Sequence, residues 1–272
     1  SWASLPPVPA VPSTAYLAKM ASERTSLIRE DDENKELCGI EDTAVRHGFV
    51  RKVYYILGAQ LAVTTLVGGI VMKLAASIAR SNPTLLMTLM LCSLVVSIAS
   101  TCVFVCCPDT MRHTPTNYIL LAAFTVAEAV LVGFISAAYT QESVLIVLAV
   151  TAFVVAGLTL FACQTKYDIT GFYPYAVCAA WAMCGFGFVI FVASLCGLSA
   201  ASPAFQTMRL LYAFCGVLLF SFFIVLDTQL IVGGKHSKMR FSVDDYCMAA
   251  IHLYIDIVNL FIYLLEILGD RD

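Results

Sequence analysis

Four carboxylic acids lie inside long apolar stretches of this sequence, where an ionised side chain is unfavourable. They are Glu128, Asp227, Asp256 and Glu266. A charged side chain at the centre of a bilayer costs roughly 2.5–3.5 kcal/mol on insertion scales. The sequence has no lysine or arginine at comparable depth in these stretches. We therefore expect protons, hydrogen bonds or a passing cation to neutralise these acids, which indicates proton or cation handling.

The two aspartates are placed so that their carboxyl groups can meet. Asp227 lies near the end of the apolar stretch 209–232, and Asp256 lies well inside the next stretch, 247–268. At about 1.5 Å per helical residue, both lie roughly 8–14 Å from the same end of two antiparallel helices. Two carboxylates in a medium of low dielectric constant do not both ionise easily, so the pair is predicted to share one proton.

The last apolar stretch also carries a row of polar residues. At about 100° per residue they form one stripe roughly 80° wide on a helix. A polar stripe on an apolar spanning helix should face protein or water. The stripe consists of His252, Asp256, Asn259, Tyr263 and Glu266. The residues predicted to line an ion path are Glu128, His252, Asn259 and Glu266.

The same residues also allow a purely structural interpretation. Asp227, Asp256 and Glu128 could be protonated and hydrogen-bonded, with no role in transport. His252 could be a packing residue, and Glu266 could extend toward the membrane surface. A zinc site at His252 and Asp256 would have too few ligands. The expected metal interaction is therefore transient calcium binding at the two aspartates, and no cofactor is expected.

The composition indicates a membrane protein. The chain has 272 residues, of which 60% are hydrophobic and 13% charged, whereas soluble domains carry about 25% charged residues. A membrane-spanning helix needs about 20 apolar residues, and seven stretches qualify. We therefore predict an all-α membrane protein with a seven-helix bundle. The stretches are 53–74, 85–106, 117–139, 144–163, 172–198, 209–232 and 247–268.

The charges divide the chain into two parts. Eight of the 19 acids lie in the first 42 residues, together with four prolines. This composition predicts a disordered tail over residues 1–45 and a transmembrane domain over residues 46–272. No basic patch suggests nucleic-acid binding.

Lysine and arginine near the span ends predict the orientation, because they concentrate on the cytosolic side. Eight of these basic residues lie on one side of the predicted membrane and four on the other, which predicts an N-terminus in the cytosol. The eight are Arg46, Arg51, Lys52, Arg112, Lys166, Lys235, Lys238 and Arg240, and the four are Lys73, Arg80, Arg209 and Arg271.

Several segments carry a resemblance to a known family. Both aspartates lie in such segments, VLDTQLIVGGKH at 225–236 and LYIDIVNLF at 253–261. Further matches are FVRKVY at 49–54, and Asn117-Tyr118 through FTVAE at 124–128. With these motifs the chain resembles the transmembrane Bax-inhibitor-motif family, Lifeguard branch, from about residue 45 to its end.

The resemblance implies a seven-helix bundle whose last helix is central. It also implies a pH-sensitive calcium leak across an intracellular membrane, of the endoplasmic reticulum or Golgi, and suppression of cell death. In relatives the aspartates that correspond to Asp227 and Asp256 sense pH and gate the pore. The implied partners are the lipid bilayer, calcium, protons and cell-death regulatory proteins. Some bacterial relatives hold the aspartate pair with an arginine and a glutamate of the second span, and the stretch 85–106 has neither.

Two other classes of function compete with a calcium leak. The first is a non-conducting membrane adaptor that acts on death signalling through its acidic tail. The second is an intramembrane aspartyl protease, which would carry Gly-x-Gly before its second aspartate. Here Leu253, Tyr254 and Ile255 precede Asp256, so we do not expect an enzyme.

Overall fold

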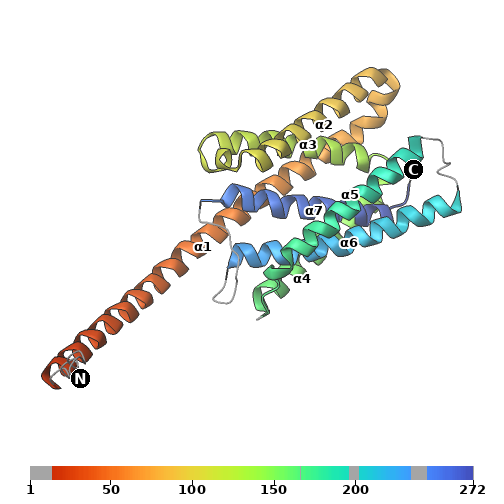
Figure 1. The fold of residues 1–272 in the computed structure, drawn as a ribbon. Helices are drawn as coiled ribbons and strands as arrows, with labels where there is room; N and C mark the ends of the chain where they lie inside the picture. The colour runs from red at the N-terminus through yellow and green to blue at the C-terminus, as the bar shows by residue number, and fades with distance from the viewer. Residues whose placement is uncertain (1–13, 166, 196–201, 234–243, 272) are drawn as a thin grey trace, which may run out of the picture. The chain divides into compact units, whose positions relative to one another are not determined.

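The computed structural model describes the backbone of residues 14–165, 167–195, 202–233 and 244–271, and the side chains of these ranges from residue 45 onward. Figure 1 shows the helices in order along the chain. Two of them are short 3-10 helices, η1 (Pro108–Arg112) and η2 (Thr170–Phe172). The α-helices of the described part are α1 (Thr14–Ser81), α2 (Pro83–Cys106), α3 (Thr116–Ser136), α4 (Gln141–Gln164), α5 (Tyr173–Leu195), α6 (Pro203–Val232) and α7 (Tyr246–Leu268).

Among the residues that the structure describes, seven helical segments are long and apolar enough to cross a membrane, with mean hydropathy between 1.8 and 2.8. This confirms the predicted class of a seven-helix membrane protein. Most boundaries differ from the prediction by a few residues; the first span is longer, Val45–Ser81 in place of 53–74. The predicted end of the fifth span, 196–198, lies outside the described residues.

The chain divides into two units, Ser1–His47 and Gly48–Asp272, close to the boundary expected at residue 45. In the first unit the backbone is helical from Thr14 onward, where the composition predicts a disordered tail. The helix begins just after the last proline of the leader, Pro12, and residues 14–47 contain a single glycine. A segment without proline keeps every backbone donor, so helix is compatible with this sequence. The cytosolic position of this segment stays a prediction.

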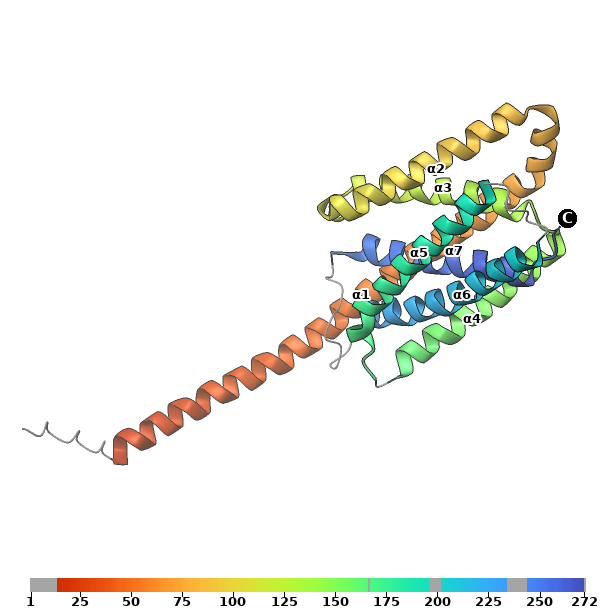
Figure 2. The same ribbon diagram turned by 45° about the vertical axis from the view of Figure 1, so that its right-hand side comes forward.

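Within the second unit, α7 is the most buried helix. Of its most apolar window 67% is buried, compared with 6% for the span that contains α5 and 17% for α2. The helix packs against α3, α4 and α6, and Figures 1 and 2 both show it beside α6. The last helix is therefore central, as expected. The span Val45–Ser81 and the spans of α2, α4 and α5 bury only 6–17% of their apolar windows, so most of the apolar surface of these spans is exposed and suited to contact with lipid.

Local sequence signals set the helix ends. Asn82 and Ser202 cap α2 and α6 with their side chains, and each is followed by proline at the first helical position. Proline suits this position because its missing N–H would have no partner there. Helix α6 ends at Gly233, whose φ of 56° is a left-handed conformation that favours glycine.

A close approach between α1 and α3 depends on glycine. A Cβ atom added to Gly133 would lie 2.7 Å from the Cβ of Val71 and 2.8 Å from the carbonyl oxygen of Gly68. Both distances are shorter than a normal carbon contact. Only glycine therefore fits at position 133 without moving α1, and α3 stays close enough for the polar contacts described below.

Candidate functional site

The structure brings the two aspartates together from neighbouring helices. Asp227 of α6 is 2% exposed and Asp256 of α7 is 6% exposed, and the two carboxyl groups are close enough to interact electrostatically. No donor among the described residues reaches Asp227 Oδ1 or Asp256 Oδ2. Because an ionised carboxylate can only accept hydrogen bonds, a hydrogen bond between the two carboxyl groups would require one proton on the pair.

The surroundings of the pair are nearly free of compensating charge. His252, one turn before Asp256, places its Nδ1 3.7 Å from Asp227 Oδ2. The phenol of Tyr173 in α5 is close enough to interact electrostatically with both aspartates. In the described part of the chain no lysine or arginine forms an ion pair with either aspartate. The charge of the pair itself therefore changes only by gain or loss of a proton.

The polar stripe of α7 faces α6. His252 lies beside Asp227, and further along the stripe the hydroxyl of Tyr263 donates to that of Tyr212 at 3.2 Å. The exception is Asn259, whose side-chain amide donates to the backbone carbonyl of Ile255 at 2.8 Å. Of the stripe residues only Asp256 is buried and the other four are half-buried. His252 and Tyr263 contact α6, whereas the Asn259 amide bonds to its own helix.

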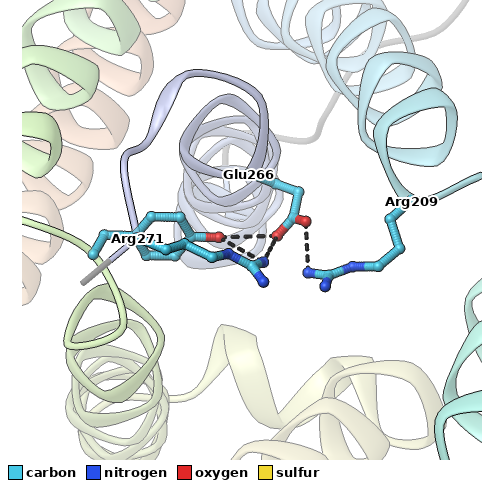
Figure 3. A network of polar contacts seen from close by, with 4 residues as sticks. Arg209, Glu266 and Arg271 are labelled. Carbon is cyan, nitrogen blue, oxygen red and sulfur yellow. Dashed lines mark hydrogen bonds and ion pairs between the residues drawn. The ribbon is translucent and has the colours of Figure 1, made fainter. Parts of the chain in front are cut away.

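Glu266 ends the stripe in an ion-paired cluster, the Glu266 clasp, which Figure 3 shows. Arg209 donates to its Oε1 at 2.6 Å, and Arg271 and Tyr139 donate to its Oε2 at 2.8 and 2.9 Å. Two guanidinium groups beside one carboxylate disfavour cation binding there. Glu266 is ten residues from Asp256, about 15 Å along the helix. It therefore belongs to a separate site near the other end of α7.

Glu128 lies apart from the aspartate pair. Its Oε1 accepts a short hydrogen bond from Ser97 of α2, and it is close enough to Tyr254 of α7 to interact electrostatically. Tyr254 precedes Asp256 by two residues, which turns their side chains about 200° apart on a helix. Glu128 thus adjoins a different face of α7 from the polar stripe. The sequence predicts that Glu128 and residues of the stripe line one ion path, but the structure separates them.

The partner of Glu266 was missed by reasoning from sequence, although a signal existed. Arg209 lies six residues after the first residue of α6 (Pro203), and Glu266 lies two residues before the last residue of α7 (Leu268). In antiparallel neighbours these positions have similar depth, so the comparison that paired the two aspartates would have paired these residues too. In the sequence, Arg209 contributes only to the prediction of orientation, as a basic residue near a span end.

The residues that suggested the orientation are described only in part. Lys166, Lys235, Lys238 and Arg240 lie outside the described residues. At the beginning of α7, Arg112 donates to Asp245 at 2.7 Å, and the Lys52 ammonium lies 3.2 Å from the centre of the Tyr246 ring. The hydrogen bond from Arg112 to Asp245 raises the pKa of Arg112 above its ordinary value. Basic residues therefore gather at this end of α7, while the side of the membrane stays a prediction.

Comparison with known proteins decides the family. The family model described as "Inhibitor of apoptosis-promoting Bax1" matches residues 46–272, a range that contains both aspartates and every helix from α2 to α7. The chain belongs to this Bax inhibitor family. The resemblance drawn from the motifs around Asp227 and Asp256 is thereby confirmed.

Similar members of the Bax inhibitor family carry the name lifeguard. The chain is 32% identical to human Protein lifeguard 3 over 237 residues, which cover 85% of this chain and 71% of the relative. It is 35% identical to mouse Protein lifeguard 4 over 245 residues, which cover 88% of this chain and 92% of the relative. The match to mouse Protein lifeguard 3 is 31% identical and covers 85% and 72% of the two chains.

Proposed function

We propose that this protein is a proton-regulated calcium leak of an intracellular membrane and that it suppresses cell death. The observation that supports the leak is the burial of Asp227 and Asp256 within range of each other's charge, where a mutual hydrogen bond would require a proton. Loss of that proton removes the hydrogen bond and leaves two negative charges in a site of low dielectric constant. Charge repulsion then favours separation of α6 and α7, and carboxylate oxygens are the ligands that calcium prefers.

The direct test is calcium flux from proteoliposomes that contain the purified full-length chain, measured across a pH series. We expect flux to rise with pH as the pair loses its proton. Asp227→Asn and Asp256→Asn retain the size of each side chain but cannot be deprotonated, so each variant should alter the pH response, because the remaining aspartate titrates without its partner.

A matched control is Glu142→Gln, which neutralises an exposed acid in the first turn of α4. This variant should keep the pH response of the unchanged protein. Unaltered pH dependence in both aspartate variants would exclude gating by the pair. Absence of flux at every pH, in a preparation that retains its helical content, would exclude the leak itself.

A second candidate is a non-conducting adaptor that acts through the N-terminal unit. Two observations favour it: residues Ser1–His47 form a unit of their own, and the family match begins only at residue 46. Deletion of residues 1–42 separates the two functions. If the variant loses protection from cell death but keeps its calcium flux, protection is exerted through the adaptor segment. If it keeps both, the membrane domain is sufficient.

The proposed location is the endoplasmic reticulum or Golgi membrane, with the N-terminus in the cytosol. Protease protection tests this topology, using an epitope tag placed before Ser1 and a second tag after Asp272. In sealed microsomes the first tag should be digested, whereas the second should survive until detergent is added. The reverse pattern would contradict the orientation.

A further inference from the structure

A groove with a volume of about 270 Å³ lies between α1, α3, α4 and α7. The outer wall of the groove is formed by α4, where Leu145 is 65% exposed. Its floor is apolar, is only 6–8% exposed, and consists of Val132, Ile257, Val258 and Phe261. The groove is therefore closed toward the interior of the bundle and open toward the surface that contacts lipid.

Two adjacent glycines of α1 set the width of the groove. A Cβ atom added to Gly68 would lie 3.2 Å from the carbonyl oxygen of Ala129 in α3. A Cβ atom added to Gly69, which lines the groove, would meet nothing within 4 Å. The first glycine thus packs α1 against α3, and the second leaves free space.

Hydrogen bonds hold together the helices that line the groove. Gln60 of α1 donates to the Thr125 hydroxyl of α3 at 3.0 Å. The hydroxyl groups of Thr64 and Tyr254 lie 2.8 Å apart, which joins α1 to α7. The groove is therefore already formed, and an occupant does not need to separate these helices.

The hydroxyl groups along the groove are largely engaged. Thr65 donates to the Leu61 carbonyl at 2.8 Å, and Thr151 donates to the Val147 carbonyl at 2.7 Å. Thr64 also has a partner, as described above. Ordered water needs two to four polar partners, and the lining offers few free ones along its length. An apolar occupant therefore suits this groove better than water does.

The groove has one polar end. Lys73 is the only charged residue in its lining, is exposed, and forms no ion pair with any residue that the structure describes. Gln141, the first residue of α4, also lines the groove. Because successive spans alternate in direction, the end of α1 and the beginning of α4 lie at the same membrane surface. A cation and an amide thus meet at the mouth of a mostly apolar groove.

The length of the groove matches one leaflet of a bilayer. Leu61 and Lys73 line it twelve residues apart on α1, which is about 18 Å along a helix. One leaflet contributes about 15 Å, half of the roughly 30 Å hydrocarbon core. When Lys73 lies at the depth of the head groups, Leu61 therefore reaches the middle of the bilayer.

We propose that this groove binds one acyl chain of an anionic phospholipid, whose phosphate group contacts Lys73 and Gln141. The Lys73 ammonium pairs with the phosphate, the Gln141 amide donates to it, and the chain lies along the apolar floor. A helix of a second copy is a poorer occupant, because a helix with its side chains is about 10 Å wide and the groove holds only about 270 Å³. The proposal does not depend on calcium flux.

Photolabelling in proteoliposomes tests the proposal. The full-length chain is reconstituted in phosphatidylcholine with a trace of phosphatidylserine that carries a diazirine on its acyl chain. Mass spectrometry of peptides then measures the label on the groove segments, residues 61–73 and 141–151, relative to the label on α5, which is exposed to lipid. Groove segments should be labelled more strongly than α5 in the unchanged protein.

Gly69→Leu should reduce labelling of the groove segments severalfold, because the leucine side chain fills the free space. The matched control is Gly58→Leu on the same helix, where a Cβ atom also meets nothing within 4 Å and which does not line the groove. Equal groove labelling in these two variants would mean that lipid only surrounds the bundle, and the proposal would be wrong.

The head-group contact has its own variants, which keep the test decisive if Gly69→Leu fails to fold. Lys73→Gln should lower groove labelling by about fivefold, the effect of one basic residue near an anionic surface, whereas Lys73→Arg should retain it. Arg80→Gln, an exposed basic residue outside the groove, should behave as the unchanged protein. Unaltered labelling in Lys73→Gln would contradict the proposed contact.

Light scattering of the detergent-purified protein distinguishes the other occupant. If the unchanged protein is a dimer and Gly69→Leu makes it a monomer, a second copy occupies the groove and the lipid proposal is overturned. An unchanged mass in Gly69→Leu, together with reduced labelling, supports the lipid. Neither result bears on gating by the aspartate pair, since calcium flux tests that separately.

Discussion

Arg209 in α6 donates a 2.6 Å hydrogen bond to the carboxylate of Glu266 in α7, and the two side chains are only 28% and 25% exposed. Arg271 donates to the other carboxylate oxygen at 2.8 Å. Beside the clasp, the amide of Thr140 donates to the Asp270 carbonyl at 2.9 Å. These contacts join the end of α7 to the beginning of α6 and to the turn between α3 and α4.

Glu266→Gln should lower the unfolding temperature of the purified protein. The change leaves two guanidinium groups beside a neutral amide, and hydrogen bonds to charged groups contribute about 1.5–3 kcal/mol each. We expect a net loss of about 1–3 kcal/mol, since the arginines regain partial hydration. Thermal unfolding in detergent measures the effect, with Glu142→Gln as control. Equal unfolding temperatures for the two variants would show that the clasp does not stabilise the bundle.

Tyr139 makes the clasp sensitive to alkaline pH. Burial raises the pKa of the Tyr139 phenol, an effect that its hydrogen bond with Arg271 opposes in part. A group whose pKa is raised on folding stabilises the folded state fully below its unfolded pKa, here about 10. That contribution is lost as pH rises through the higher folded value. Unfolding temperatures should therefore fall less steeply above pH 10 in Tyr139→Phe than in the unchanged protein, and identical slopes would contradict this role.

Gly133→Ala should destabilise the contact between α1 and α3. The added methyl group would lie within 3 Å of Val71 and of the Gly68 carbonyl, and overpacking of this kind costs about 1–3 kcal/mol. The matched control is Gly157→Ala, because a Cβ atom there meets nothing within 4 Å. Alanine also favours helix over glycine, so the control should be neutral or slightly stabilising in a thermal unfolding assay.

The aspartate pair should behave as one unit in flux measurements. If Asp227 and Asp256 share a single proton, either asparagine replacement leaves one carboxyl that titrates without its partner. Only the double replacement removes both carboxyl groups and should abolish the pH response, and its effect should differ from the sum of the two single effects, as expected of coupled groups. Additive effects of the two replacements in proteoliposomes would indicate two independent sites.

Much of the fold follows from the sequence because the membrane imposes a simple rule. Every backbone polar group in lipid needs an internal partner, so long apolar stretches form helices. The stretch 247–268 accordingly corresponds to α7, Tyr246–Leu268. The helix from Thr14 was not predicted, because an acidic composition favours solvation but does not distinguish coil from a solvated helix.

Helical spacing and depth predict some contacts of the candidate site from the sequence. Spacing and depth were enough to predict that Asp227 and Asp256 lie on facing helices, since helical rise and period fix a residue's height and direction. The same rules, applied to Arg209 and Glu266, would have found the clasp.

The sequence by itself determined the helices, their order and the heights of their polar residues, because these depend on hydropathy and helix geometry alone. Only the tertiary structure decided which faces meet. It placed Glu128 beside Ser97 and Tyr254, and left Gln60 Oε1 buried without a donor. Such contacts depend on how each helix is rotated about its own axis, which close packing of glycines and large side chains sets and which no local pattern encodes.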